Sequence, residues 1–126
     1  MKNMRLALIL TTAFLLSFGF SSCKKVTEPK DVAANFYEAL QKNDVDKAIT
    51  YLYFEEDADK EEVDALKEKY VMLLAYTEGV KSFEVLEQEI DGETATVKMN
   101  IVMGNGEEND DVLELIQVNN EWKIKP

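Results

Sequence analysis

The sequence predicts an α+β domain in which three N-terminal helices pack on one face of a four-stranded antiparallel sheet. Apolar residues recur with the 3.6-residue period of an α-helix between residues 29 and 78. From residue 81 onward most apolar residues alternate with polar ones, which indicates strands. Helices followed by a run of strands are typical of the α+β class. The chain of 126 residues has room for one such domain.

Residues 1–22 have the three-part layout of a secretory signal peptide. A positively charged start, MKNMR, precedes the uncharged stretch LALILTTAFLLSFGF, and two serines follow. The positive end is expected to stay on the cytoplasmic side of the membrane. We therefore expect this leader to direct export and to be removed.

Cys23 is the only cysteine of the chain, and it directly follows the two serines. Three interpretations are open: a retained membrane helix, ordinary secretion with a free thiol, or lipidation of Cys23 as the new N-terminus. Small residues before a cysteine resemble the bacterial lipoprotein box, although Phe20 stands where an aliphatic residue is usual. Because a free thiol on an exported protein is a redox liability, we favour lipidation.

Lipidation would make residues 23–28 an anchored cysteine followed by a short tether, which holds the domain close to the membrane. The sequence thus predicts a bacterial cell-envelope lipoprotein that contacts the membrane through its N-terminal lipid. No acidic run follows Cys23. By analogy with the surface-export signals of some lipoproteins, this favours the periplasmic side.

The chain is strongly acidic, with 14 basic and 25 acidic residues and a net charge of −11. The leader holds two of the basic residues and no acidic one, so residues 23–126 carry a net charge of −13. Such a charge repels phosphate backbones and anionic lipid surfaces, which argues against nucleic acid as a partner. Apolar and aromatic residues run along the same part of the chain, so we expect a folded domain.

Three helices are predicted, and they span residues 29–42, 44–54 and 59–78. Pro29 suits a first helical turn, and either Thr27 or Glu28 is the candidate cap. Each helix has an apolar stripe: Val32, Ala33, Phe36, Tyr37 and Leu40 in the first; Val45, Ala48, Ile49 and Leu52 in the second; Val63, Leu66, Tyr70, Leu73, Leu74 and Thr77 in the third. These stripes are expected to pack on the sheet.

The last turns of the third predicted helix are apolar on two sides. From Val71 onward the side opposite to the stripe is also apolar, with Met72 and Ala75. A helix that is apolar all round is usually buried. We therefore expect the end of this helix to be covered on more than one side.

Four strands are predicted, and they span residues 81–90, 94–103, 111–118 and 121–125. The first has a mixed alternation that allows a β-bulge. DGE and NN provide turns, and GNGEEND is a polar loop. The inward face of the second strand is expected to carry Ala95, Val97, Met99, Ile101 and Met103. In the last strand, Trp122 and Ile124 are expected to face the core.

The opening helix pair of the nuclear-transport-factor-2-like (NTF2-like) superfamily resembles residues 36–52, FYEALQKNDVDKAITYL. Its curved sheet is similar to residues 91–124, DGETATVKMNIVMGNGEENDDVLELIQVNNEWKI. The lipoprotein box and the WKI end together resemble the small lipoproteins grouped as domain of unknown function 4878. This resemblance covers about residues 29–125, and Asn43 departs from it because a glycine before the aspartate is common there.

The resemblance implies that residues 29–126 form a cone-shaped domain with a pocket between the helices and a curved sheet. Many such domains dimerise through the sheet. Val102, Val112 and Ile116 are expected on the solvent side of the sheet, where they would form an apolar patch. A homodimer or a docked envelope partner on this face is therefore the alternative role.

Enzymes of this superfamily use an acid–base set inside the cone, often with histidine, aspartate or tyrosine. This chain has no histidine, which is the commonest general base and metal ligand. We therefore expect no enzymatic activity, no catalytic residue and no cofactor. Four polar residues lie within the predicted strands, and one of them is a candidate to point into the cone: Glu87, Glu89, Asn100 or Glu114.

A calcium loop is the one metal motif that the sequence partly matches. In DADKEEVDALKE, residues 57–68, acidic side chains occupy four of the ligand positions of a helix–loop–helix calcium loop. Glu62 stands where the motif requires glycine, and Asp64 stands where an apolar residue usually packs. The same residues suit the acidic first turn of a helix. We therefore expect no metal site.

Most aromatic side chains of the domain are expected in the core. Tyr37, Tyr70 and Trp122 are the best candidates for pocket walls, because each combines an apolar ring with a polar atom. The sequence thus predicts a non-catalytic module that binds a small apolar or amphipathic ligand in its cone.

Overall fold

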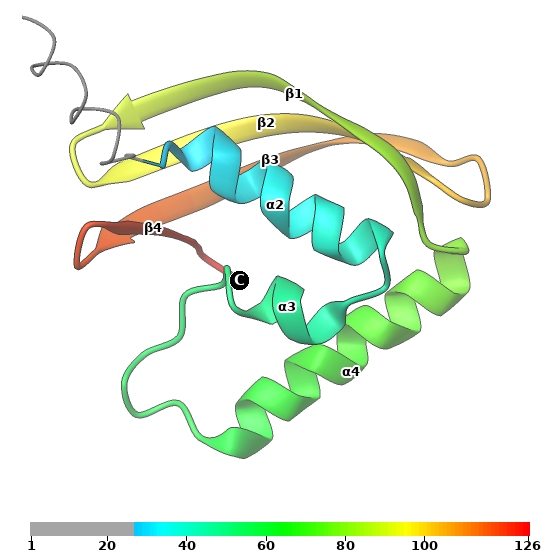
Figure 1. Cartoon of the computed structure of the whole chain (residues 1–126), viewed down its shortest axis with the longest axis horizontal. Helices are drawn as coiled ribbons and strands as arrows, with labels where there is room; N and C mark the ends of the chain where they lie inside the picture. The colour runs from blue at the N-terminus through cyan, green and yellow to red at the C-terminus, as the bar shows by residue number, and fades with distance from the viewer. Residues whose placement is uncertain (1–26) are drawn as a thin grey trace, which may run out of the picture.

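The computed structural model describes residues 27–126, so the predicted signal peptide, Cys23 and most of the tether lie outside the described residues. Three helices precede a four-stranded antiparallel sheet, which confirms the predicted fold class (Figure 1). The elements are α2 (Pro29–Gln41), α3 (Val45–Ile49), α4 (Lys60–Thr77), β1 (Val80–Asp91), β2 (Thr94–Met103), β3 (Glu108–Val118) and β4 (Glu121–Ile124). Residues 24–126 therefore contain every described element. Within residues 27–126, no helix is long and apolar enough to cross a membrane.

The sheet is a meander in which β1, β2, β3 and β4 follow one another in space as in sequence. The predicted NN turn joins β3 to β4, and Asn119 and Asn120 adopt left-handed φ angles of 51° and 66°, as two-residue hairpins require. The bulge that the sequence allowed is present in β1, where the register shifts between Val85 and Glu87. A bulge bends its strand, and the sheet curves over α2 (Figure 1).

β3 begins earlier than predicted, because the loop before it is shorter. The side chain of Asn105 accepts a hydrogen bond from the Glu107 N–H at 2.9 Å and donates one to the Glu107 carboxylate at 2.7 Å. These bonds close the turn at residues 104–107, and Glu108 already pairs with Val102 of β2. The last three residues of the predicted polar loop, 108–110, are therefore strand, although their composition is typical of a loop.

α2 lies along the concave side of the sheet (Figure 1). Its start is capped by Glu28, one of the two predicted candidates, whose backbone N–H donates to the Asp31 carboxylate at 3.1 Å. The predicted apolar stripe is buried in full: Val32, Ala33, Phe36, Tyr37 and Leu40. Opposite this stripe, the inward face of the sheet buries Ala95, Val97, Met99, Ile101, Leu115, Trp122 and Ile124, with Met103 half-buried. The core therefore lies between α2 and the sheet, as predicted.

α3 is shorter than predicted, since it ends at Ile49 instead of continuing to Phe54. The chain after it pairs with the edge of the sheet. The Tyr53 N–H donates to the Ile124 carbonyl at 2.7 Å, and the Ile124 N–H donates to the Tyr51 carbonyl at 2.9 Å. Leu52 lies between these two bonds and forms a parallel β-bridge with Ile124. Its side chain is buried in the core, although it does not belong to a helix.

α4 begins and ends as the sequence suggests, but the prediction that its end is covered on several sides is wrong. Val71, Met72 and Tyr76 have exposed fractions of 53%, 70% and 80%, whereas Leu74 is 6% exposed. The reason is that α4 packs mainly against α3 and makes few contacts with the sheet. Several apolar side chains of α4 therefore border solvent or the space between the helix and the sheet.

Candidate functional site

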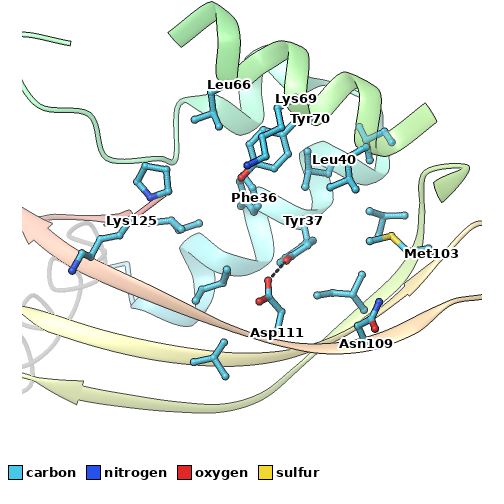
Figure 2. A pocket seen from close by; sticks show the side chains of 18 of the residues that line it. Phe36, Tyr37, Leu40, Leu66, Lys69, Tyr70, Met103, Asn109, Asp111 and Lys125 are labelled. Atoms are coloured by element: carbon cyan, nitrogen blue, oxygen red, sulfur yellow. Dashed lines mark hydrogen bonds between the residues drawn. The ribbon is translucent and has the colours of Figure 1, made fainter. Parts of the chain in front are cut away.

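An open cleft of about 1110 Å³ lies between α2, α4 and the concave side of the sheet (Figure 2). The cleft exists because α4 stands off from the sheet instead of packing on it. Its lining includes Leu40 from α2, Leu66 from α4, Met103 from β2 and Leu113 from β3. Typical small-molecule sites have volumes of roughly 300–1000 Å³ and are mostly apolar. The cleft therefore has the size and the character of a ligand site.

One wall of the cleft is built from aromatic rings held edge to face. The ring of Phe36 lies 5.8 Å from that of Tyr70 and 5.2 Å from that of Tyr37, both in edge-on geometry. On the other side, the ring of Tyr37 lies 6.0 Å from that of Phe83 in β1. Such pairs hold rings in place more firmly than area burial alone. This wall thus links α4, α2 and the sheet.

A single carboxylate, that of Asp111, meets this wall inside the cleft. The hydroxyl of Tyr37 donates to Asp111 Oδ2 at 2.8 Å (Figure 2). Tyr37 is only 7% exposed, and Asp111 is half-buried on β3 opposite Met99, which is fully buried. The hydrogen bond therefore joins a helix to a strand across the narrow part of the cone.

The two tyrosines of the cleft hold their protons firmly. Burial raises the pKa of Tyr37 above its usual range, and the hydrogen bond to Asp111 raises it further. Burial also raises the pKa of Tyr70, with a smaller contribution from the negative charge of Asp111. Both phenols are therefore neutral hydrogen-bond donors near pH 7, and neither is suited to act as a general base.

The four polar strand residues singled out from the sequence lie elsewhere. Glu87, Glu89 and Glu114 are exposed, and the amide of Asn100 donates to the Asp110 carboxylate at 2.9 Å. The prediction that one of these four points into the cone is thus not supported by their burial and contacts. The sequence analysis does not single out Asp111, because this residue directly follows the predicted polar loop. Its position two and four residues before Leu113 and Leu115, which face inward on the same strand, indicates that it faces inward too.

Of the three predicted pocket residues, the structure brings two together at the cleft. Tyr37 and Tyr70 both line it. Trp122 is 8% exposed and belongs to the core beneath the sheet, and it is not among the residues that line the cleft. Cys23, the predicted lipidation site, lies outside the described residues.

The acidic run that partly matches a calcium loop is used to start α4. Asp59 accepts a hydrogen bond from the Glu62 N–H at 2.9 Å, and the Asp59 N–H donates back to the Glu62 carboxylate at 3.4 Å. This is a capping box, in line with the interpretation as a first helical turn. Across residues 27–126, no group of three or more aspartate, glutamate, cysteine or histidine side chains is arranged to hold a metal ion.

Several solved structures share this fold. A Campylobacter jejuni protein with the provisional name NTF2-like transpeptidase has a TM-score of 0.64 at 20% identity, with 79% of this chain and 99% of that chain covered. A cystatin-fold protein from Novosphingobium aromaticivorans has a TM-score of 0.57 at 13% identity, with 79% and 97% covered. A de novo designed NTF2 fold protein reaches 0.54 at 14% identity, with 81% and 87% covered. The domain therefore has the NTF2-like fold, as the sequence resemblance implied.

The sequence profile of one family matches most of the chain. That family is the domain of unknown function DUF4878, and the match extends over residues 21–125. The chain belongs to this family, which confirms the resemblance noted from its sequence. No curated protein matches the chain in sequence.

Proposed function

We propose that the protein is a membrane-anchored module of the bacterial cell envelope that binds a small apolar or amphipathic ligand without transforming it. The observation that carries this proposal is the open, mostly apolar cleft in which the carboxylate of Asp111 is held by the Tyr37 hydroxyl. Sites that bind small ligands usually combine an apolar surface with few polar groups that fix orientation. Asp111 and the two tyrosine hydroxyls provide such groups.

Two observations support binding without catalysis. The chain has no histidine, the commonest general base. Enzymes of this superfamily also use aspartate and tyrosine, and Tyr37 and Asp111 both line the cleft, but the Tyr37 hydroxyl donates its hydrogen bond to Asp111 at 2.8 Å and not into the open space. The likeness to the Campylobacter jejuni protein, at 20% identity, concerns the fold alone and brings no transpeptidase activity to this chain.

The anchoring part of the proposal rests on the leader and on Cys23. The family match begins at residue 21 and so includes this cysteine and the small residues before it. A lipid on Cys23 would hold the domain within a few residues of the bilayer. The cleft would then be placed where amphipathic molecules leave and enter the membrane.

A second candidate function is docking of a partner protein, favoured by the apolar residues that α4 exposes. Met72 and Tyr76 are 70% and 80% exposed. A homodimer through the sheet is less favoured, because the face around Val112 is otherwise polar, with exposed Glu84, Glu114 and Lys98. Such a face has little contiguous apolar surface for a second copy to cover.

Native mass spectrometry of residues 24–126, purified gently from the source organism, tests both candidates. We expect a small-molecule adduct that survives gentle ionisation, and its mass would begin to identify the ligand. A mass without adduct in repeated preparations would contradict the proposal. A dimer or a bound protein in its place would support the docking function.

A matched pair of variants tests whether the adduct is bound in the cleft. Leu113 lines the cleft on β3, whereas Leu86 lies at the β1 bulge, is 45% exposed and does not line it. Leu113→Trp fills space that the ligand needs, so we expect it to remove most of the adduct. Leu86→Trp adds the same indole ring outside the cleft, so the adduct is expected to remain. Equal adduct in both variants would show that binding occurs elsewhere.

A further inference from the structure

Asp111 is a carboxylate without a cation of its own. None of the ion pairs found among residues 27–126 includes it. Its side-chain hydrogen bond within that part of the chain comes from the hydroxyl of Tyr37, which is bound to Oδ2. The second oxygen, Oδ1, therefore has no donor from the described residues and is free to accept one from a ligand.

Two lysines line the same cleft, but neither neutralises Asp111. Lys125 Nζ lies 3.6 Å from Glu114 Oε1, on the outer side of β3. Lys69 is exposed on α4 and forms no ion pair with any residue in the described range. The lining around Asp111 is instead aromatic and aliphatic, with Phe36 and Leu113, apart from the amide side chain of Asn109.

The carboxylate of Asp111 is half-buried beside apolar side chains, and a cation placed next to it would offset the cost of that burial. The attraction between the two charges is stronger in such a cleft than in water, because the effective dielectric constant is lower. The ring of Tyr70, which is half-buried and lines the cleft, adds a face on which a cation is also favoured. Burial raises the pKa of Tyr70, and the negative charge of Asp111 raises it further, in line with the position of both residues at the cleft.

The charge of the whole domain acts in the same direction. Residues 23–126 carry a net charge of −13, so the field around the cleft concentrates cations and repels anions. An anionic amphiphile would have to approach this domain against that field and then lie beside Asp111. A neutral one would leave the carboxylate without a partner.

We infer that the ligand is an amphipathic cation, whose apolar chain occupies the cleft and whose protonated nitrogen binds Asp111. This inference rests on the proposed function, because it assigns the ligand class of the same cleft. Asp111 is the residue that selects the charge, and Tyr37 holds its carboxylate in place. The aromatic wall and the aliphatic lining of the cleft receive the apolar chain.

Three amphiphiles with the same chain and different head groups test the inference: decylammonium, decanol and decanoate. Dissociation constants are measured on residues 24–126 by NMR shift titration, below micellar concentrations. We expect decylammonium to bind about tenfold more tightly than decanol, equivalent to about 1.4 kcal/mol, and decanoate to bind most weakly. The shifts are expected at amides of α2, α4 and β3 around the cleft.

Two variants separate the local effect of Asp111 from the general effect of an acidic surface. Asp111→Asn keeps an acceptor for Tyr37 but removes the charge, so the preference for decylammonium over decanol should vanish. Asp91→Asn removes the same charge at an exposed position at the end of β1 and should keep the preference. Asp111→Ser is the second variant if the amide does not give a native-like spectrum.

The outcomes distinguish this inference from the proposed function. Equal binding of decylammonium and decanol in the cleft, tighter binding of decanoate, or a preference that survives in both Asp111 variants would overturn the inference alone. Absence of binding of all three amphiphiles in the cleft would overturn the inference together with the proposed function. A preference lost equally in Asp91→Asn would also overturn it, since the charge would then act non-specifically.

Discussion

At the scale of single residues, the hydrogen bond from Tyr37 to Asp111 joins α2 to β3 across the cone. Tyr37→Phe removes the donor and leaves the Asp111 carboxylate with water only. We expect this change to lower the free energy of unfolding by about 1.5–3 kcal/mol, the usual contribution of a hydrogen bond to a charged group. Urea unfolding followed by circular dichroism measures it. Tyr76→Phe, at a position 80% exposed, is the control and should change nothing; an equal loss in both variants would contradict the prediction.

The same residue predicts how stability changes in alkaline solution. The pKa of Tyr37 is raised in the folded protein, first by burial and then by the hydrogen bond to Asp111. Its contribution to stability is therefore complete below the unfolded-state pKa of about 10 and is lost as the pH rises above it, because only the unfolded chain then releases the proton.

We expect the free energy of unfolding to fall with a slope of up to about 1.4 kcal/mol per pH unit above about pH 10 for each such tyrosine. Tyr37→Phe should make this slope shallower, while Tyr70, whose pKa is also raised, retains a part of it. The measurement is urea unfolding at several alkaline pH values. Identical slopes for the variant and the natural protein would rule out Tyr37 as their source.

At the scale of elements, Gly104 controls how α4 joins the sheet. The Gly104 N–H donates to the Gly79 carbonyl at 2.8 Å, and the Asn105 N–H donates to the Thr77 carbonyl at 2.9 Å. A Cβ atom at Gly104 would collide with the backbone carbonyl of Glu78, the residue that ends α4. Because the contact is with backbone, no side-chain rotation relieves it. This junction fixes one end of the cleft.

We expect Gly104→Ala to lower the free energy of unfolding by about 2–4 kcal/mol, since α4 or β2 must move. Gly92→Ala is the matched control. Gly92 has a left-handed φ of 65° but no atom near its missing Cβ, so about 1 kcal/mol is expected there. Thermal unfolding of both variants compares them. A smaller loss at Gly104 than at Gly92 would contradict the role given to this junction.

Sequence reasoning located the elements well where local signals agree, and failed where distant contacts decide. The alternation of Val97 and Met99 fixed the inward face of β2, which is buried as expected. Residues 50–54 have a helical pattern, but backbone bonds to Ile124 draw them to the sheet. Met72 is an apolar helix residue that the sequence predicts to be buried, but it is exposed because no other described element packs on its side of α4. The space between α4 and the sheet depends on how distant elements pack, so no local sequence pattern predicts it. The cleft could therefore not be predicted from such patterns.

At the scale of the whole molecule, the acidic surface of the domain is repelled by the membrane, whereas its proposed lipid anchor attaches it there. A net charge of −13 over residues 23–126 repels anionic lipid heads. A lipid on Cys23, as proposed, would hold the same domain within a few residues of the bilayer. The result would be a domain that is held at the membrane by its N-terminus alone, with its surface kept off the lipid heads. A cationic amphiphile, the proposed ligand, would be attracted both by an anionic membrane surface and by Asp111 in the cleft, so an anchored domain would be placed to exchange such molecules with the membrane.

The anchor is tested by Cys23→Ala, which removes the thiol that a lipid needs. We expect the variant to move from the membrane fraction to the soluble fraction of the envelope and to lose incorporation of labelled palmitate, because two or three acyl chains are what make attachment stable. Thr11→Ala, a change inside the apolar leader that keeps Cys23, is the control and should leave the protein on membranes. Membrane association that persists in Cys23→Ala would mean that the leader remains as a membrane helix. A natural protein found free of membranes would instead support ordinary secretion with a free thiol.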